Sequence, residues 1–502
     1  MLIKGYGVSP GVIIAVALIS IASLLYATSH IGPAAGSWAH GAGKVTDLAK
    51  PAYEAVVGSK TEQHQPTASK SGSHQTTEAK PVELGSTEGA PSFFGENEVA
   101  EVVPLCEPAY HASSEHIPAL SGQYAATHNE VSSSSIGKDG RFFPLKFGSY
   151  PAINPNIIPH PETKGNFIIV AQQHKRLGDN QAWCAELVCE AEFKDGVLQC
   201  LVEPLNLIIG HTTSTKCEGK LAMLELNIGP HDARVFYGPD HPFIIYGSQS
   251  KEVCFGQWIQ DFRLVTDWRY DFVPVQFFKE RTDMLRPPPF HLVEKNYFLF
   301  WDDKGEMYAH HDVAPSRVFA RLYADGSVGP DLAPQTRDHD EKCMSRYVAV
   351  ERTLDHIHQA TNSLALVLCS QSSSDCHKTP ENTVIMEIFQ QKTFIDGHAV
   401  YEPFVMLFES RAPFQMHGVS SKPLWINGRR ENGFSGEWPP EQSEMVYVTS
   451  MNWKEHGKKY TGYLDDKVML GFGIEDKATG GMDITARDLL RGMGYCSESG
   501  VW

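Results

Sequence analysis

The segment His231-Asp232-Ala233-Arg234 places a carboxylate and a guanidinium two residues apart, directly before an apolar run. A carboxylate held near a hydroxyl can take its proton, and general-base catalysis of this kind contributes about 10²–10⁴-fold. A guanidinium can bind phosphate oxygens through two hydrogen bonds. Asp232 is therefore the candidate catalytic base and Arg234 a candidate ligand for an anionic group. A structural turn made by the two side chains is the alternative.

Other polar side chains flank apolar runs further along the chain. Lys295 and Asn296 precede the run YFLFW, and Lys295 and Arg317 are further candidates to bind phosphate. His311 and His358 are candidates to contact sugar hydroxyls, with a structural role as the alternative. His310 and His311 are neighbours in the sequence. Adjacent residues of a strand face opposite sides, so these two histidines are not expected to bind one metal ion.

A metal-binding Asp-x-Asp pattern occurs at Asp338-His339-Asp340. It lies in the charged stretch RDHDEK with no strand-like run before it, and it is interpreted as a solvated loop. Motifs for a serine hydrolase, a P-loop or a zinc protease are missing from the sequence. We therefore expect neither a metal nor a cofactor.

Short runs rich in β-branched and aromatic residues recur from about residue 100 onward, bounded by Gly, Pro, Asp or Asn. This is the pattern of β-strands. The predicted strands are Phe167–Gln172, Pro242–Ser248, Tyr297–Trp301, Leu364–Ser370, Thr383–Gln390, Met445–Ser450 and Val468–Gly473. No long apolar pattern with a helical period lies between them, which disfavours alternating strands and helices.

Polar residues precede a strand-like run five times, near Asn154, Asp232, Lys295, His358 and Asn452. Such spacing fits blades of about 40–50 residues with variable loops. Each blade of a propeller brings its inner strand to a central axis, so polar residues at the strand ends would converge there. The sequence predicts an all-β domain folded as a five-bladed β-propeller.

The motifs of these units resemble a known family in their order along the chain. They read NPNIIPHP, GPHDARVFYG, EKNYFLFWDD and GYLDDKVMLGFGIED. They are similar to the fungal Golgi β-1,2-mannosyltransferases and, at a distance, to β-mannoside phosphorylases and hydrolases. The resemblance covers roughly residues 154–496.

The resemblance implies roles for several positions. Asn154 would line the sugar site, Asp232 would be the catalytic acid or base, and Lys295 and Asp476 would complete the site. An arginine expected after the first strand is missing, because Gln172 and Gln173 stand there. The implied donor is GDP-mannose and the implied acceptor a cell-wall mannan or glycolipid. A phosphorylase or hydrolase on the same fold, or a glycan-binding propeller without chemistry, are the alternatives.

The N-terminal region predicts a membrane protein of the secretory pathway. Residues 11–27 form an uncharged apolar run, just long enough to span a bilayer, with a cleaved signal peptide as the alternative. Residues 28–100 predict a disordered stem, because the stretch from 54 to 92 has no aromatic residue. The expected layout is a cytosolic tail (1–10), a signal anchor (11–27), this stem and a lumenal catalytic domain (101–502) in the Golgi.

The composition excludes some partners and suggests a compartment. A net charge of −17 argues against a protein that coats nucleic acid. The ten cysteines contain no zinc-finger spacing, and in an oxidising lumen several would form disulfides. Cys369 and Cys376 bracket a polar loop and are the predicted local bridge.

Overall fold

Strands dominate the computed structural model, which describes residues 124–134, 138–177, 181–266, 277–348, 357–359, 361–395, 397–431 and 442–497. The helices in these ranges are short: α4 (Arg337–Tyr347), α5 (Ala486–Leu489) and the 3-10 helices η2 (Lys138–Gly140), η3 (Gly219–Leu226), η4 (Phe262–Leu264) and η5 (Ala333–Gln335). The predicted all-β class is confirmed.

Five antiparallel units follow one another along the chain. Unit one contains β3 (Ile153–Pro159), β4 (Phe167–Leu177), β5 (Gln181–Lys194) and β6 (Val197–Cys200). Unit two contains β9 (His231–Tyr237), β10 (Pro242–Gln249), β11 (Phe255–Asp261) and β12 (Thr282–Met284). Unit three contains β13 (Phe298–Trp301), β14 (Met307–Asp312) and β15 (Val318–Arg321).

The last two units draw strands from distant parts of the chain. Unit four contains β16 (Ile357–Gln359), β17 (Leu364–Val367), β18 (Thr383–Ile395), β19 (His398–Glu409), β20 (Met416–Ser420) and β26 (Met493–Tyr495). Both β16 and β17 pair with β18, so the first strand of this unit is broken in two. Unit five contains β22 (Val446–Trp453), β24 (Lys467–Ile474), β25 (Ala478–Thr485) and β2 (Phe143–Lys146).

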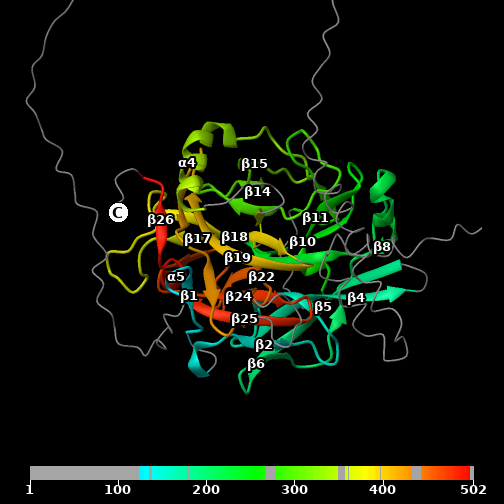
Figure 1. The fold of residues 1–502 in the computed structure, drawn as a ribbon, viewed down its shortest axis with the longest axis horizontal. Coiled ribbons are helices and arrows are strands. Elements are labelled where there is room, and N and C mark those ends of the chain that lie inside the picture. Colours follow the sequence, from blue (N-terminus) through cyan, green and yellow to red (C-terminus); the bar gives the residue numbers. More distant parts are fainter. Residues whose placement is uncertain are drawn as a thin grey trace, which may run out of the picture.

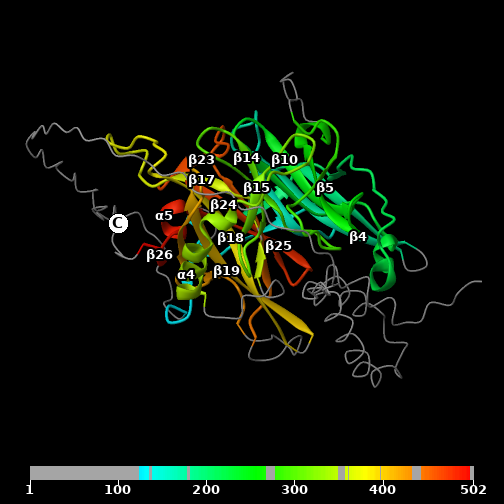
Figure 2. The ribbon, with the colours of Figure 1, turned by 90° about the horizontal axis from the view of Figure 1, so that it is seen from above.

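Strand β2 closes the chain of units on itself. It pairs antiparallel with β25 and parallel with β6, so it joins the last unit to the first (Figure 1). The C-terminal β26 pairs with β20 and lies near α4 (Figure 2). A disulfide joins Cys343 of α4 to Cys496, the residue after β26. Segments near both ends of the described chain therefore hold the sheets in a nearly closed arrangement.

Smaller strands extend the edges of these sheets. They are β1 (Asn129–Val131), which pairs with β21 (Leu424–Ile426), β7 (Leu205–Asn206) and β8 (Asn227–Ile228), which both pair with β5, and β23 (Thr461–Tyr463), which pairs with β17.

The strands of neighbouring units pack face to face, so both faces of many strands are buried. Every residue of β3 and of β10 is buried. Side-chain amides form hydrogen bonds between neighbouring units. Asn156 of unit one donates to the carbonyl of Ala233 (2.8 Å) and accepts from the N–H of Val235 (3.1 Å), both in unit two. Asn362 makes the same pair of bonds with Met451. These bonds provide hydrogen-bond partners for buried backbone groups of the facing strand.

The structure confirms the predicted strands and changes two other predictions. The first strand of unit five begins at Val446 rather than near Asn452, because Asn452 is buried inside this strand and its amide donates to the carbonyl of Val235. The stretch RDHDEK is the start of α4 rather than a solvated loop. Asp340 is buried there because it binds Arg317.

Four disulfides lie within the described residues, and the predicted Cys369–Cys376 bridge is among them. The others join Cys189 to Cys200, Cys217 to Cys254 and Cys343 to Cys496.

The predicted tail, anchor and stem (1–10, 11–27 and 28–100) lie outside the described residues. Among the helices that the structure describes, none is long and apolar enough to cross a membrane.

Candidate active site

The strands within each unit are antiparallel. The start of the first strand, the end of the second and the start of the third therefore lie at one end of the unit. We call this the site end. Three residues with left-handed backbone stand at the starts of first strands: Asn154 (φ 53°), Asp232 (φ 49°) and Asn296 (φ 63°). This conformation is uncommon for residues other than glycine and concentrates at functional positions.

Asn154 and Asp232 meet across the boundary between units one and two. The Nδ2 of Asn154 donates to Oδ1 of Asp232 at 2.8 Å. The backbone N–H of Asp232 donates to Oε1 of Gln172 (2.6 Å), and that of Ala233 donates to Oε1 of Glu186 (3.1 Å). Side chains of unit one therefore fix both the backbone and the carboxylate of Asp232, which stays half-exposed.

Gln172 lies on β4, where the resemblance implied an arginine, and it is buried. Its amide oxygen accepts the backbone N–H of Asp232, so Gln172 binds the turn at Asp232 rather than a ligand. Glu186 pairs with Gln172 in register on the neighbouring strand β5.

Glu186 is a buried acid that contacts the turn at Asp232 and Ala233. Burial raises its pKa, the N–H of Ala233 opposes this rise, and the charge of Asp232 adds to it, giving a pKa of about 8. Its Oε2 has no hydrogen-bond partner among the described residues. At neutral pH the group is protonated, so Asp232 does not face a second full negative charge from below.

Arg234 carries the positive charge of the cluster. It is buried, and its Nη1 donates to the carbonyl oxygens of Asp232 (2.9 Å) and Ala233 (3.1 Å). Its side chain also hydrogen-bonds the hydroxyl of Tyr447 from unit five. Burial raises the pKa of Tyr447 to about 12, with the nearby arginine acting against this rise. Tyr447 is the partly exposed residue of a strand that is otherwise buried.

Asp476 joins the cluster from the turn between β24 and β25 of unit five. Burial raises its pKa to about 7, and the charges of Asp232 and then Glu475 contribute to the rise. Its Oδ2 is buried without a hydrogen-bond partner in the described part of the chain. Unit five approaches Asn154 closely as well, since a Cβ at Gly473 would lie 2.6 Å from Oδ1 of Asn154.

Three of the five units thus bring together residues that were predicted from the sequence. They are Asn154, Asp232, Arg234 and Asp476. A half-exposed carboxyl group, a second carboxyl that holds its proton near neutral pH and a guanidinium share one site, which suits proton transfer and stabilisation of an anion.

Unit three repeats the construction of unit two. The backbone N–H of Asn296 donates to Oε1 of Gln257 at 2.8 Å, as that of Asp232 does to Gln172. Lys295 is exposed beside it. Both predicted residues therefore lie at the site end of unit three.

His358 lies at the site end of unit four and connects to the cluster through aromatic rings. Its ring packs edge to face on Tyr401 (centroids 5.8 Å apart), which packs in the same way on Tyr447 (4.8 Å). Lys392 lies 5.8 Å from the ring of Tyr401. This row of half-exposed rings leads from Arg234 toward unit four.

His311 is placed differently from the sugar contact that was predicted. It is buried, and its Nε2 lies 3.0 Å from the carbonyl oxygen of Leu285. Burial, reinforced by the charge of Arg286, lowers its pKa to about 4, so it is neutral. Arg286 in turn forms ion pairs with Asp312 and Glu294. His311 belongs to the packing between units two and three.

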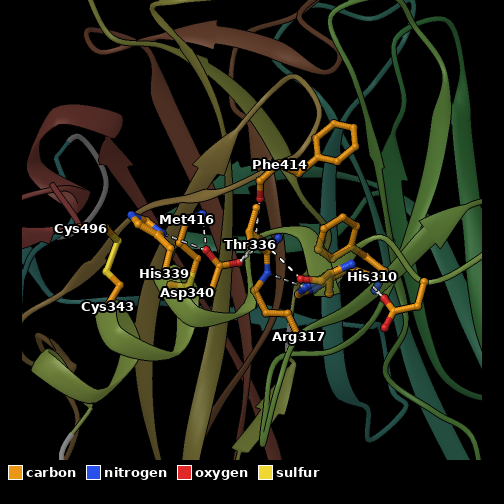
Figure 3. A network of polar contacts seen from close by, with 12 residues as sticks. His310, Arg317, Thr336, His339, Asp340, Cys343, Phe414, Met416 and Cys496 are labelled. Atoms are coloured by element: carbon orange, nitrogen blue, oxygen red, sulfur yellow. Dashed lines mark hydrogen bonds and ion pairs between the residues drawn. A yellow bond between two sulfur atoms is a disulfide. The ribbon is translucent and has the colours of Figure 1, made fainter. Parts of the chain in front are cut away.

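Arg317 was predicted to bind phosphate, but the structure gives it another partner (Figure 3). Its Nη1 donates to Oδ2 of Asp340 and to the carbonyl oxygen of Phe414, both at 2.8 Å. Its guanidinium lies 4.7 Å from the ring centres of Phe319 and Phe408. Because its charge is neutralised by a buried carboxylate, Arg317 anchors α4 and is unsuited to a ligand.

Several site residues escaped sequence reasoning. They are Tyr447, Glu186 and Glu475, which look in the sequence like ordinary polar residues of strands or strand ends. The one available signal in the sequence was the motif GIED, which pointed to Asp476 but not to the neighbouring Glu475. Among the described residues, no group of three or more His, Cys, Asp and Glu side chains is arranged to hold a metal ion.

Comparison with known proteins does not assign this chain to a family. No protein-family model and no curated protein matches the sequence. Solved structures that align with it include a mannose phosphorylase, MPT-4, from Leishmania mexicana (12% identity, 70% of this chain and 88% of that chain, TM-score 0.37). A GDP-Man-dependent mannosyltransferase, MPT-1, from the same organism aligns at 10% identity over 68% of this chain and 88% of that chain (TM-score 0.37).

A third structure is the catalytic domain of an α-L-arabinofuranosidase of family GH62 from Coprinopsis cinerea (9% identity, 68% of this chain and 96% of that chain, TM-score 0.34). All three proteins act on sugars by name. Scores of this size establish neither the fold nor the activity of this chain.

Proposed function

We propose that the five units are the blades of a five-bladed β-propeller and that the protein is an inverting β-mannosyltransferase. It transfers mannose from GDP-mannose to a cell-wall mannan or glycolipid acceptor. The observation that carries this proposal is the half-exposed carboxylate of Asp232 beside Arg234 and Asp476. This carboxylate accepts a hydrogen bond from Asn154, and the backbone N–H of Asp232 donates to Gln172.

The proposed reaction uses Asp232 as the base. One oxygen of its carboxylate accepts a hydrogen bond from the amide of Asn154. The carboxylate takes the proton of an acceptor hydroxyl. The acceptor oxygen then bonds to the anomeric carbon as the bond from that carbon to the phosphate oxygen breaks. The leaving diphosphate gains negative charge, which the positive field of Arg234 stabilises more in the transition state than in the ground state. Asn296 and Lys295 are proposed to line the site from unit three.

A second candidate function is supported by Asp476. A carboxyl with a pKa of about 7 can donate a proton to a glycosidic oxygen, which a phosphorylase or hydrolase of β-mannosides requires. Transfer from a nucleotide donor does not require Asp476 as a proton donor, because a diphosphate leaves as an anion. A protonated Asp476 still favours this transfer, because it adds no negative charge beside the leaving anion.

The two candidates are separated by one set of assays on the purified protein. We expect release of GDP when GDP-mannose and mannose oligomers are supplied, and no mannose 1-phosphate when mannose oligomers and phosphate are supplied. The variant Asp232→Asn should lose about 10²–10⁴-fold in kcat. Asp303→Asn, at an exposed hairpin tip, is the matched control and should be unchanged. Full activity of Asp232→Asn would remove the proposed base.

The proposed location is the Golgi membrane, with residues 11–27 as a signal anchor and the catalytic domain in the lumen. Four disulfides within the described residues support an oxidising compartment. Extraction with alkaline carbonate followed by protease protection tests this: the anchored form stays with the membrane and its domain is protected.

A further inference from the structure

Glu475 is the residue before Asp476 and is held at three points. Its Oε1 accepts the backbone N–H of Met445 (2.5 Å) and lies 3.1 Å from Nε2 of His398. Its own N–H donates to the carbonyl oxygen of Met445 at 3.1 Å. The side chain of Glu475 therefore ties the β24–β25 turn to the first residue of β19 and to the segment before β22.

His398 faces an acceptor with each ring nitrogen. Its Nδ1 lies 2.5 Å from Oε1 of Gln442, and its Nε2 faces the carboxylate of Glu475. With the amide oxygen of Gln442 at Nδ1 and the carboxylate of Glu475 at Nε2, the arrangement favours the imidazolium form, in which both nitrogens donate. Burial alone would lower the pKa of His398, but the hydrogen bonds to Glu475 and Gln442 outweigh it and raise the pKa above its usual value.

The turn that carries Asp476 needs such a hold. Glu475 and Asp476 both adopt left-handed backbone, at φ 50° and φ 45°. Each such residue costs about 1–2 kcal/mol. Two in succession persist only where side-chain contacts enforce them, and the contacts of Glu475 with Met445 and His398 do so here.

We propose that His398 and Glu475 form a positioning pair that holds the turn of Asp476 in place and screens Asp476 from the charge of Glu475. The imidazolium neutralises Glu475, whose charge would otherwise act on the neighbouring carboxyl of Asp476. This inference rests on the proposed function, because it assigns Asp476 a part in the same reaction. It adds two residues that touch no reacting group.

Among the described residues, titratable groups on several elements face this pair. Asp476 faces Asp232 from β9, Tyr447 from β22 with Arg234 behind it, and Glu475 in its own turn. His398 faces Glu475 and Gln442, with the charge of Arg429 nearby. As the pH rises, His398 loses its proton and the charge of Glu475 is exposed. A like charge raises the pKa of a carboxyl, so Asp476 keeps its proton to higher pH.

Two conservative variants give opposite shifts if this is right. Glu475→Gln keeps an acceptor for Met445 and His398 but removes the charge, so the alkaline fall of kcat/KM moves to lower pH by about one unit. His398→Gln keeps a donor for Glu475 but removes the cation, so the fall moves to higher pH. KM should change less than kcat, because neither residue contacts substrate. Equal profiles for both variants, or shifts in the same direction, would overturn the proposal.

The chain offers a matched control on the other end of strand β19. His417 pairs with Glu409 at 3.1 Å, a distance equal to that between His398 and Glu475, but far along the strand from Asp476. His417→Gln should leave the pH profile unchanged. A shift as large as that of His398→Gln would mean that any lost His–Glu pair alters the profile, and would refute the specific role.

A second measurement keeps this test separate from the proposed function. If the wild-type protein transfers no mannose, the proposed function fails, and the pair is tested by stability. Urea unfolding between pH 4 and 8 is measured for each variant with and without Asp476→Asn, so that the difference isolates the titration of Asp476. The upper end of that titration should fall in Glu475→Gln and rise in His398→Gln. An unchanged titration in both would overturn the inference.

Discussion

Replacing Glu186 by glutamine should stabilise the protein at neutral and alkaline pH and change little at pH 5. In the folded protein the pKa of Glu186 is about 8, against 4.5 for the unperturbed group. The folded state therefore keeps a proton that the unfolded state releases above pH 4.5. Stability contributed by this group falls as the pH rises from 4.5 to 8 and is constant outside that window.

The size of the effect follows from this window. Each unit of pH within it costs about 1.4 kcal/mol, so the penalty is below about 1 kcal/mol at pH 5 and about 3 kcal/mol at pH 7. It reaches about 5 kcal/mol above pH 8. Glutamine removes the penalty because it does not ionise, while its amide oxygen can still accept the N–H of Ala233. The unpartnered Oε2 of the acid becomes an unpartnered NH₂, so the hydrogen-bond count is unchanged.

The assay is urea unfolding of wild type and variant at pH 5, 7 and 9, with linear extrapolation to water. Glu192→Gln is the matched control, because Glu192 lies on the same strand β5 but is exposed. It should change stability by less than about 0.5 kcal/mol at each pH. A gain for Glu186→Gln that is equal at pH 5 and 9, or a loss at pH 7, would show that Glu186 is ionised in the folded protein and would refute the reasoning.

Three further predictions concern the site, helix α4 and the C-terminal strand. Asn154→Asp places a like charge against Asp232, so the acidic fall of kcat/KM should move up by about one pH unit or more, while an unchanged profile would contradict their contact. Arg317→Leu should cost about 3–5 kcal/mol in urea unfolding because it leaves Asp340 buried and unpaired, and adding Asp340→Leu should recover most of this loss. Replacing Cys343 and Cys496 by serine should cost about 2–5 kcal/mol, whereas an unchanged midpoint in non-reducing urea would show that the bridge does not form.

The amino-acid sequence determined the local features of this protein. Runs such as Phe167–Gln172 and Val468–Gly473 became strands, because β-branched and aromatic residues between turn residues have few other stable local conformations. Cys369 and Cys376 could be paired from the sequence because only a short loop separates them.

Motif order also pointed to four of the site residues. Asn154, Asp232, Arg234 and Asp476 stand at strand ends, where polar residues are conspicuous beside apolar runs. The contact between Asn154 and Asp232 was implicit in the prediction that the strand ends converge.

Only the tertiary structure decided which charges pair inside the fold and which gather at the candidate site. Arg317 and Asp340 look in the sequence like ligands or surface charges, yet they neutralise each other in the interior. Glu186 and Tyr447 look like ordinary strand residues, yet they lie against Asp232 and Arg234. The physical reason is that burial and charge pairing depend on neighbours from other units, which sequence spacing does not specify, and these neighbours set both the partner and the protonation state of each group.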